Sequence, residues 1–263
     1  MNKQEFNKEI EKIINILDKN FPEQNFDISS KLYCADLLED FKFIRKNIKN
    51  SELKILDLGC GKGHLSALLS IFLQNRIQAV DLLESFGEGG SFNVESLGER
   101  WQDTTWQDFQ KNYRVDYEFY NGQTLPYPDQ AFDVLIAYAV LEHVENENYF
   151  LQECARVLRN NGQLFIFRCP SRLSITENLT KVLKLPHHER LYDQKLLKNL
   201  FGQNGFEIKQ IKRYDTFPAF IPLKNKQGFW NNLFPVNNIL RNLFKISPFN
   251  IFAHHFKLLA IKK

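Results

Sequence analysis

The feature that most constrains the fold is a short apolar segment that runs into three glycines at alternate positions. Residues 55–58 have the composition of a short buried strand, and Gly59, Gly61 and Gly63 follow them. After Gly63 the apolar residues recur at helical spacing, which predicts an amphipathic helix. A strand, a glycine turn and a helix in this order expose backbone N–H groups at the turn, where a ligand can bind. The pattern therefore predicts a ligand site at this turn.

Two acidic residues lie beside the predicted turn. Asp57 precedes the glycines within the strand, and Asp81 ends a second apolar segment at residues 76–80. A carboxylate at the end of the second strand of a Rossmann-type sheet accepts hydrogen bonds from ribose hydroxyls. The two segments together predict a site for a cofactor that contains a ribose.

These residues resemble the class I S-adenosylmethionine-dependent methyltransferases, in the small-molecule branch that includes quinone and sugar methylases. The resemblance spans about residues 50–215. A glycine turn alone also occurs in nicotinamide and flavin enzymes, but their G-x-G-x-x-G spacing is incomplete here. The segments that carry the resemblance are D-L-G-C-G-K-G at 57–63, Asp81, L-P-Y-P-D at 125–129, A-F-D at 131–133 and L-E-H-V at 141–144.

The resemblance implies a Rossmann-like, doubly wound α/β fold. Its sheet would be mostly parallel and seven-stranded, with an antiparallel edge strand and added helical cover. The implied cofactor is S-adenosyl-L-methionine. The residues implied to bind it are Asp57, Gly59, Cys60, Gly61, Gly63, Asp81, Leu82, Asn121, Gly122, Ala137 and Tyr138. Asn121 stands where relatives commonly have an aspartate that accepts the adenine amino group; its amide oxygen can accept the same bond without a charge.

A hydroxyl acceptor must lose a proton during methyl transfer, and an imidazole is a suitable base near neutral pH. His143, after the fourth predicted strand, is the first candidate for this base, and ordering of the loop is the alternative role. His187 and His188 are second candidates. A metal site in this His-His-Glu run is not expected, because adjacent residues rarely point the same way. Three arginines are candidates for binding an anionic acceptor, with plain surface positions as the alternative: Arg168, Arg172 and Arg190.

The predicted organisation has four parts. Residues 1–50 form an N-terminal helical cover, with helices at 3–18 and from about 29 to 48. Tyr33 is a candidate contact for the methionine end of the cofactor. Residues 51–214 form the cofactor-binding core. An aromatic and basic insertion at 215–255 forms a lid, a dimer surface or a membrane-surface element, and 256–263 form the final strand, antiparallel at the sheet edge.

Within the core, the remaining elements follow from periodicity and from glycine and proline positions. A glycine-rich loop at 82–103 is either a mobile loop beside the ribose site or a surface excursion. Asn161 and Gly162 are expected to cap a helix, and residues 171–192 to be irregular. The predicted strands are 114–120, 132–140, 163–169 and one from 205, with helices at 148–158 and 193–200.

Composition limits the alternatives. The net charge is +3, and basic residues gather after residue 209. The sequence has no apolar run of about 18 residues and no signal peptide at its start, so a cytoplasmic protein is expected, with contact at the inner membrane surface as an alternative. Four scattered cysteines fit a reducing compartment.

The expected partner is a small-molecule methyl acceptor. A lipid-linked substrate or membrane contact through 229–252, and a homodimer, remain open. A nucleic-acid methylase is disfavoured because the N/D-P-P-Y signature is absent. A non-catalytic S-adenosylmethionine-binding or scaffold protein is the other alternative.

Overall fold

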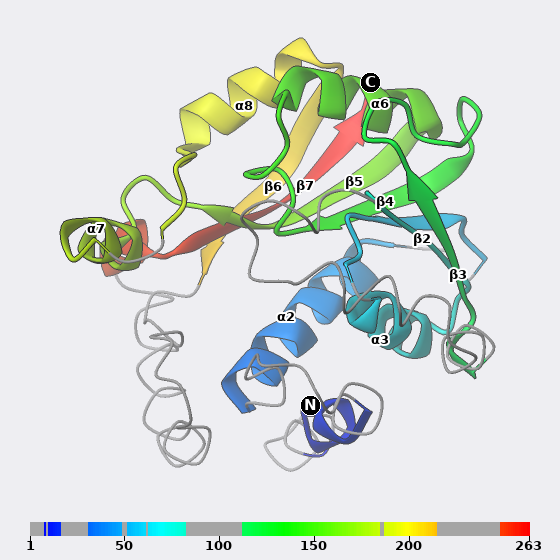
Figure 1. Ribbon diagram of the computed structural model, residues 1–263, viewed down its shortest axis with the longest axis horizontal. Helices are drawn as coiled ribbons and strands as arrows, with labels where there is room; N and C mark the ends of the chain where they lie inside the picture. Colours follow the sequence, from blue (N-terminus) through cyan, green and yellow to red (C-terminus); the bar gives the residue numbers. More distant parts are fainter. Residues whose placement is uncertain are drawn as a thin grey trace. The chain divides into compact units, whose positions relative to one another are not determined.

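The computed structural model describes residues 8, 10–16, 31–48, 52–61, 63–82, 112–184, 187–214 and 248–263. One seven-stranded sheet lies at its centre (Figure 1). Its strands are β1 (Ile55–Leu58), β2 (Ile77–Leu82), β3 (Val115–Tyr120), β4 (Phe132–Tyr138), β5 (Leu158–Pro170), β6 (Phe206–Tyr214) and β7 (His255–Lys262). Their order across the sheet is β3-β2-β1-β4-β5-β7-β6, which confirms the predicted doubly wound α/β fold.

The five strands from β3 to β5 are parallel to one another. β1 is buried along its whole length, and β4 is buried from Val134 to Ala137, as expected of strands covered on both faces. The register pairs Leu58 of β1 with Val80 of β2 and with Ala137 of β4. The segments that follow these three strands therefore lie at one edge of the sheet, where open α/β sheets bind their ligands.

β7 is antiparallel, as predicted, but the prediction that it forms the sheet edge is wrong. It lies between β5 and β6, so β6 is the edge strand. Residues His255 to Ala260 of β7 are all buried, whereas β6 is buried only at its two end residues and is exposed at Glu207, Lys209 and Lys212. The charged side chains of β6 suit an edge, where they discourage pairing with another sheet.

Helices cover both faces of the sheet (Figure 1). α6 and α8 lie on one side of it and α3 on the other. The predicted N-terminal helices are confirmed where residues are described, over 10–16 and in α2. The helices are α2 (Lys31–Asn47), α3 (His64–Leu73), α6 (Glu147–Val157), α7 (Ile175–Val182) and α8 (Gln194–Gln203), with a 3-10 turn, η1, at Pro248–Phe252.

Two local predictions are wrong. Asn161 and Gly162 do not cap α6, because β5 begins at Leu158, directly after that helix. They lie at an irregularity where the pairing of β4 with β5 shifts. Gly162 is needed there: a Cβ would lie 2.8 Å from the Arg159 carbonyl oxygen. The second error concerns residues 171–192, which were expected to be irregular and contain α7.

The chain divides into two compact units. One comprises residues 1–49, 170–193 and 212–256, and the other comprises 50–169, 194–211 and 257–263. All predicted cofactor-binding residues belong to the second unit. The four predicted domains stay a prediction. Most of the predicted loop at 82–103 and of the insertion at 215–255 lies outside the described residues.

All four cysteines are buried and none forms a disulfide bond, in agreement with the absence of a pairing pattern. Among the residues that the structure describes, no helix combines the length and apolar character needed to cross a membrane.

Candidate cofactor site

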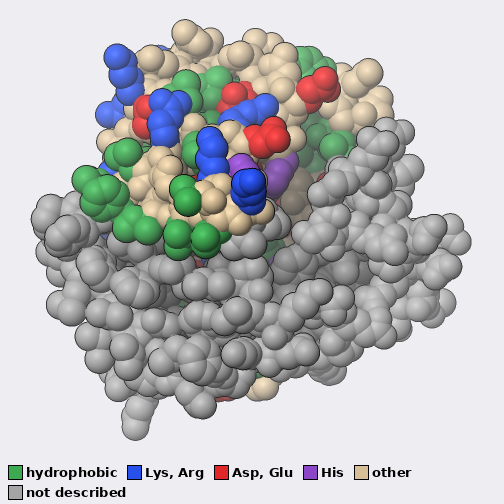
Figure 2. Space-filling model, turned by 60° about the vertical axis from the view of Figure 1, so that its left-hand side comes forward, with side chains coloured by type: hydrophobic (Ala, Val, Ile, Leu, Met, Phe, Trp, Pro, Cys, Tyr) green, Lys and Arg blue, Asp and Glu red, His purple; other side chains and the backbone are tan. Residues whose placement is uncertain are grey.

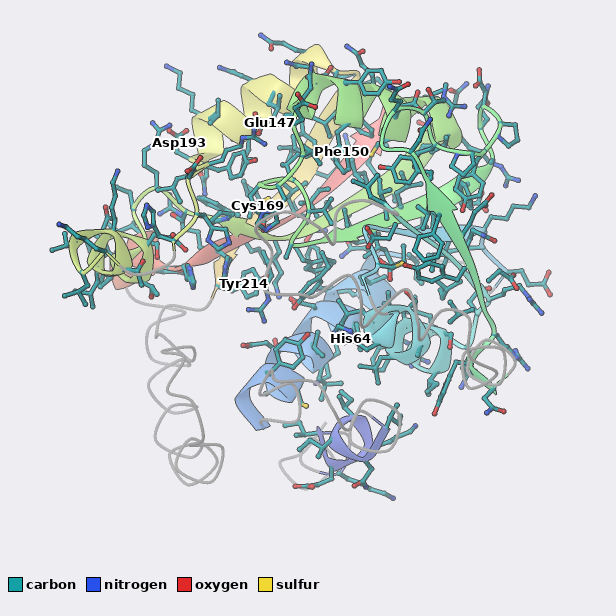
Figure 3. The ribbon with its side chains drawn as sticks, viewed as in Figure 1. His64, Glu147, Phe150, Cys169, Asp193 and Tyr214 are labelled. Carbon is teal, nitrogen blue, oxygen red and sulfur yellow. The ribbon has the colours of Figure 1, made fainter. Side chains whose placement is uncertain are left out.

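The glycine turn after β1 depends on backbone conformations that only glycine adopts readily. Gly59, Gly61 and Gly63 all have positive φ angles, of 74°, 54° and 74°. The N–H groups of Gly59 and Cys60 both donate to the Val80 carbonyl, at 2.9 and 3.2 Å, which fixes the turn to the end of β2. Gly63 ends the turn, and His64 begins α3 (Figure 3).

Asp81 closes the turn from the second strand. Its carboxylate accepts hydrogen bonds from the Gly61 N–H and, at 2.7 Å, from the Leu82 N–H. The Tyr117 hydroxyl of β3 donates to the Gly61 carbonyl at 2.9 Å. Both polar groups of Gly61 are thus held by the neighbouring strands, and Asp81 is placed where the sequence predicts it.

Asp57 lies beneath the turn and is almost fully buried. The Ser66 hydroxyl of α3 donates to its carboxylate at 2.6 Å. Burial raises the pKa of Asp57 to about 7; the Ser66 hydrogen bond opposes this effect and the nearby Asp81 charge adds to it. Asp57 and Asp81 therefore place two interacting carboxyl groups next to the glycine turn.

Cys60 is buried within the same turn. Burial, with the charges of Asp57 and Asp81, raises the pKa of its thiol well above the ordinary value. A thiol in this environment stays protonated near neutral pH and is a poor nucleophile. Its side chain is a small packed group, and its backbone N–H and carbonyl hydrogen-bond to Val80 and Gly63.

The segment after β3 carries Asn121 and Gly122. Asn121 is exposed, and its amide oxygen accepts a hydrogen bond from the Gln123 N–H at 3.1 Å. Gly122 has a φ of 80°, and a Cβ there would lie 3.1 Å from the Leu82 side chain. Because Leu82 pairs with Tyr120, these residues lie beside the end of β2. The sheet register thus brings Asn121 and Gly122 to the same edge as Asp81.

Arg156 and Glu153 of α6 anchor the L-P-Y-P-D segment that follows. The Arg156 guanidinium donates to the carbonyls of Leu125, at 3.0 Å, and Tyr127, at 2.7 Å. Glu153 accepts from the Leu125 N–H at 2.9 Å and from Arg156 at 2.8 Å. The hydrogen bond from Arg156 lowers the pKa of Glu153, despite partial burial, so this carboxylate remains charged. Arg156 and Glu153 thus fix the segment that follows the predicted adenine contacts in the sequence.

The end of β4 provides Ala137, which is buried, and Tyr138. The Tyr138 hydroxyl accepts a hydrogen bond from Arg168 Nε at 3.0 Å, and its ring stacks on Phe167. His143 follows in a turn in which its N–H donates to the Val140 carbonyl at 2.9 Å. Its side chain is 65% exposed, and its Nε2 lies 3.8 Å from the Glu142 carboxylate.

The family model described as a methyltransferase domain matches residues 56–166. This range contains the glycine turn, Asp81 and the segments after β3 and β4. Residues 56–166 form a class I S-adenosylmethionine-dependent methyltransferase domain.

The chain is similar to a probable S-adenosylmethionine-dependent methyltransferase of Mycolicibacterium smegmatis, 28% identical over 166 residues. That match covers 63% of this chain and 54% of the relative, so the chain spans about half the length of this relative. A ubiquinone biosynthesis O-methyltransferase of Pelagibacter ubique is 26% identical over 167 residues, which are 60% of this chain and 63% of the relative.

Among solved structures, a phosphoethanolamine N-methyltransferase 2 of Haemonchus contortus in complex with S-adenosyl-L-methionine has a TM-score of 0.58. It is 14% identical, and the superposition covers 95% of this chain and 56% of that one. At this identity the likeness supports the fold alone.

The predicted acceptor-binding residues are divided between the two compact units. His187, His188, Arg172 and Arg190 belong to the other compact unit. Arg168 is 9% exposed and bound to Tyr138. Arg172 lies 3.3 Å from Asp193, which precedes α8 (Figure 3). A joint role of these arginines in binding an anionic acceptor stays a prediction.

Three residues that contact the glycine turn or Asp57 were not predicted from the sequence. Ser66 binds Asp57, Tyr117 binds Gly61, and the Val140 side chain packs against Gly59. Ser66 could have been found from the sequence, because it is a small polar residue within an otherwise apolar helix face. Tyr117 and Val140 could not, because their contacts depend on the pairing of strands that are far apart in the sequence.

Proposed function

We propose that this chain transfers the methyl group of S-adenosyl-L-methionine to an oxygen of a small molecule. A sugar, a lipid-linked saccharide and a quinone-like ring are the proposed acceptor classes. The observation that carries the proposal is the glycine turn joined to Asp81, at the edge of the sheet where the predicted adenine contacts also lie. Two relatives support an oxygen acceptor by their names. One is the Pelagibacter O-methyltransferase, and the other is a 27-O-demethylrifamycin SV methyltransferase of Amycolatopsis mediterranei, 29% identical over 111 residues.

The residues of the turn fit this cofactor. A carboxylate accepts hydrogen bonds from hydroxyl groups, and Asp81 lies near the end of β2, where a Rossmann-type site binds the ribose. A Cβ placed on Gly61 would meet no described atom within 4 Å, so there is space against the turn. The Gly122 N–H and the Asn121 amide oxygen would bind the adenine.

The bound cofactor supplies the sulfonium, whose methyl group leaves readily, so the chain mainly binds, orients and excludes water. Correct alignment of the acceptor can lower the barrier by roughly 7–11 kcal/mol. The Asp81 carboxylate would supply a negative charge that suits a cationic cofactor, and Asp57 would add to it in its ionised form. His143 is the proposed base: its ring is accessible, and the Glu142 carboxylate 3.8 Å away would stabilise the imidazolium formed on proton uptake.

Replacement of Asp81 tests the cofactor site. Asp81→Ala removes both ribose acceptors and the bond to Gly61, so the affinity for S-adenosylmethionine, measured by calorimetry, should fall at least about tenfold. Asp116→Ala, an exposed aspartate on the neighbouring strand β3, is the matched control and should bind normally. Equal affinities of the two variants for the cofactor would show that Asp81 does not bind it.

Methyl release separates an enzyme from a non-catalytic binding protein. Wild-type protein should produce S-adenosylhomocysteine when mixed with cell extract, and His143→Gln should bind the cofactor normally while releasing product more slowly. A protein that binds the cofactor and never produces S-adenosylhomocysteine with any extract would refute the proposed activity. The proposed lipid contact and dimer involve residues 229–252, which are almost all outside the described ranges.

A further inference from the structure

Three side chains converge within one compact unit, and none of them is assigned to the cofactor. Glu177 lies in the first turn of α7, His188 in the segment between α7 and α8, and His254 directly before β7. His188 Nδ1 lies 2.8 Å, and His254 Nε2 2.7 Å, from the same oxygen of Glu177, Oε1. The three ligand-type atoms all lie within 4.8 Å of one another.

The Glu177 carboxylate is fixed and charged. Its residue is 4% exposed, and its other oxygen, Oε2, accepts from the His188 N–H at 3.0 Å. Burial by itself would raise the pKa of Glu177, but the hydrogen bonds from His188 and His254 outweigh burial and lower the pKa well below its ordinary value. An ionised carboxylate only accepts hydrogen bonds, so both imidazole nitrogens that face it carry protons.

The start of α7 holds this carboxylate in place. Ser174 caps the helix, and its hydroxyl accepts a hydrogen bond from the Glu177 N–H at 3.1 Å. The helix N-terminus also favours a negative charge in its first turn. Two of the three donor groups are therefore oriented independently of any ligand: Glu177 by the helix start, and His188 by its backbone bond to Glu177.

We propose that Glu177, His188 and His254 bind one divalent transition-metal ion, with zinc as the best match. Two imidazole nitrogens and one carboxylate oxygen form a recognised donor set for tetrahedral zinc, with water in the fourth position. Mg²⁺ and Ca²⁺ prefer sites made of oxygen ligands, and this cluster offers one carboxylate. The His188 side chain is 30% exposed, so the ion can enter from its side. On the face shown in Figure 2, histidine side chains reach the surface among acidic and basic ones.

Binding requires a small rearrangement of the cluster. Donor atoms about 2.0 Å from a tetrahedral ion lie about 3.3 Å apart, so the two present contacts of 2.7 and 2.8 Å must widen by about half an ångström. Each neutral imidazole would move its proton to its other nitrogen, to Nε2 of His188 and to Nδ1 of His254. This tautomer change frees a lone pair on each ring without net loss of a proton.

A metal titration tests the proposal. Untagged full-length protein is stripped with a chelator, dialysed and titrated with Zn²⁺ in a calorimeter, and with Co²⁺ in an absorption spectrometer. We expect one ion per chain and the visible spectrum of tetrahedral Co²⁺ with nitrogen and oxygen ligands. Glu177→Gln and His254→Gln should each weaken binding by more than roughly 100-fold, because loss of a ligand exceeds the effect of losing an outer-shell partner. His187→Gln is the matched control and should bind like wild type.

Several outcomes would overturn the proposal. They are wild-type protein that binds no equimolar metal, variants that bind as tightly as wild type, and a Co²⁺ spectrum with the charge-transfer bands of a thiolate ligand, which would place the ion on a cysteine. Circular dichroism of each metal-free variant checks folding, and the wild-type titration stands even where a variant does not fold. Asp81→Ala should keep the metal while losing the cofactor, so failure of the proposed function leaves this test intact.

Discussion

Gly59 and Gly61 share a left-handed backbone conformation but have different surroundings. A Cβ on Gly59 would lie 2.5 Å from the Val140 side chain, whereas a Cβ on Gly61 would meet no described atom within 4 Å. Both substitutions would incur the conformational cost of placing a side chain at positive φ, which is roughly 1–2 kcal/mol. Only Gly59 has, in addition, a packed neighbour that must move. Substitutions at the two glycines can therefore distinguish effects on the stability of the turn from effects on ligand binding.

The pair of variants Gly59→Ala and Gly61→Ala tests this difference. Gly61→Ala should lower the unfolding free energy by about 1–2 kcal/mol and strongly weaken binding of S-adenosylmethionine, because its methyl group projects into the proposed cofactor space. Gly59→Ala should lower the unfolding free energy by about 1 kcal/mol more than Gly61→Ala, because its added methyl group clashes with Val140. Chemical denaturation and calorimetry measure the two quantities. Normal cofactor binding by a folded Gly61→Ala protein would contradict the assigned cofactor position.

Residues of the site could be predicted from the sequence where they lie in a strand or directly after it. Asp57, Asp81 and the glycines were found because local sequence alone specifies a strand, a turn and a helix. The partners Tyr117 and Val140 were not, because they reach the turn through strand pairing between residues far apart in sequence. Whether each predicted residue binds the cofactor still awaits the binding measurements.

Among the elements, β7 shows most clearly what periodicity does not reveal. The sequence predicted its residues and its antiparallel direction, but not its place between β5 and β6, because the order of strands depends on non-local pairing. The run of apolar residues in β7 was the indication available in the sequence, because such a run fits an interior strand, and β7 is indeed buried. α7 had a local sign that was overlooked: Ser174 and Glu177 form the S-x-x-E pattern of a capping box.

An interior β7 and an edge β6 should respond differently to the same change. Leu258→Gln places an amide where the side chain is fully buried, and it should cost roughly 2–5 kcal/mol of unfolding free energy. Lys209→Gln, on an exposed position of β6, should stay within about 0.5 kcal/mol of wild type. Urea denaturation measures both. Similar losses for the two variants would contradict the interior position of β7.

The stability of the whole molecule depends on pH through Asp57. Its pKa is about 7 in the folded protein against an ordinary value of 3.8, chiefly because of burial. Between these two values the folded protein holds a proton that the unfolded chain has lost. Stability from this group is therefore complete below the lower value and decreases as the pH rises through the higher one. A shift of this size corresponds to at most roughly 4 kcal/mol.

Asp57→Asn should remove this pH dependence. Wild-type protein should lose unfolding free energy between about pH 4 and about pH 7, and the variant should lose measurably less over the same interval. At the upper end the variant should be the more stable protein, because it has no buried charge. Denaturation curves at several pH values give the slopes, with Asp116→Asn as the exposed control. Parallel slopes for wild type and Asp57→Asn would show that Asp57 titrates normally.

The bond between the Gly61 N–H and the Asp81 carboxylate also determines which nucleotides this molecule excludes. Loops of similar shape hold the diphosphate of dinucleotides with their free N–H groups. Here that donor is already bound to the Asp81 carboxylate. A diphosphate would not receive this hydrogen bond and would meet a charge of the same sign at close range, which is strongly unfavourable where water is scarce. We therefore expect the turn to disfavour dinucleotides that carry a diphosphate.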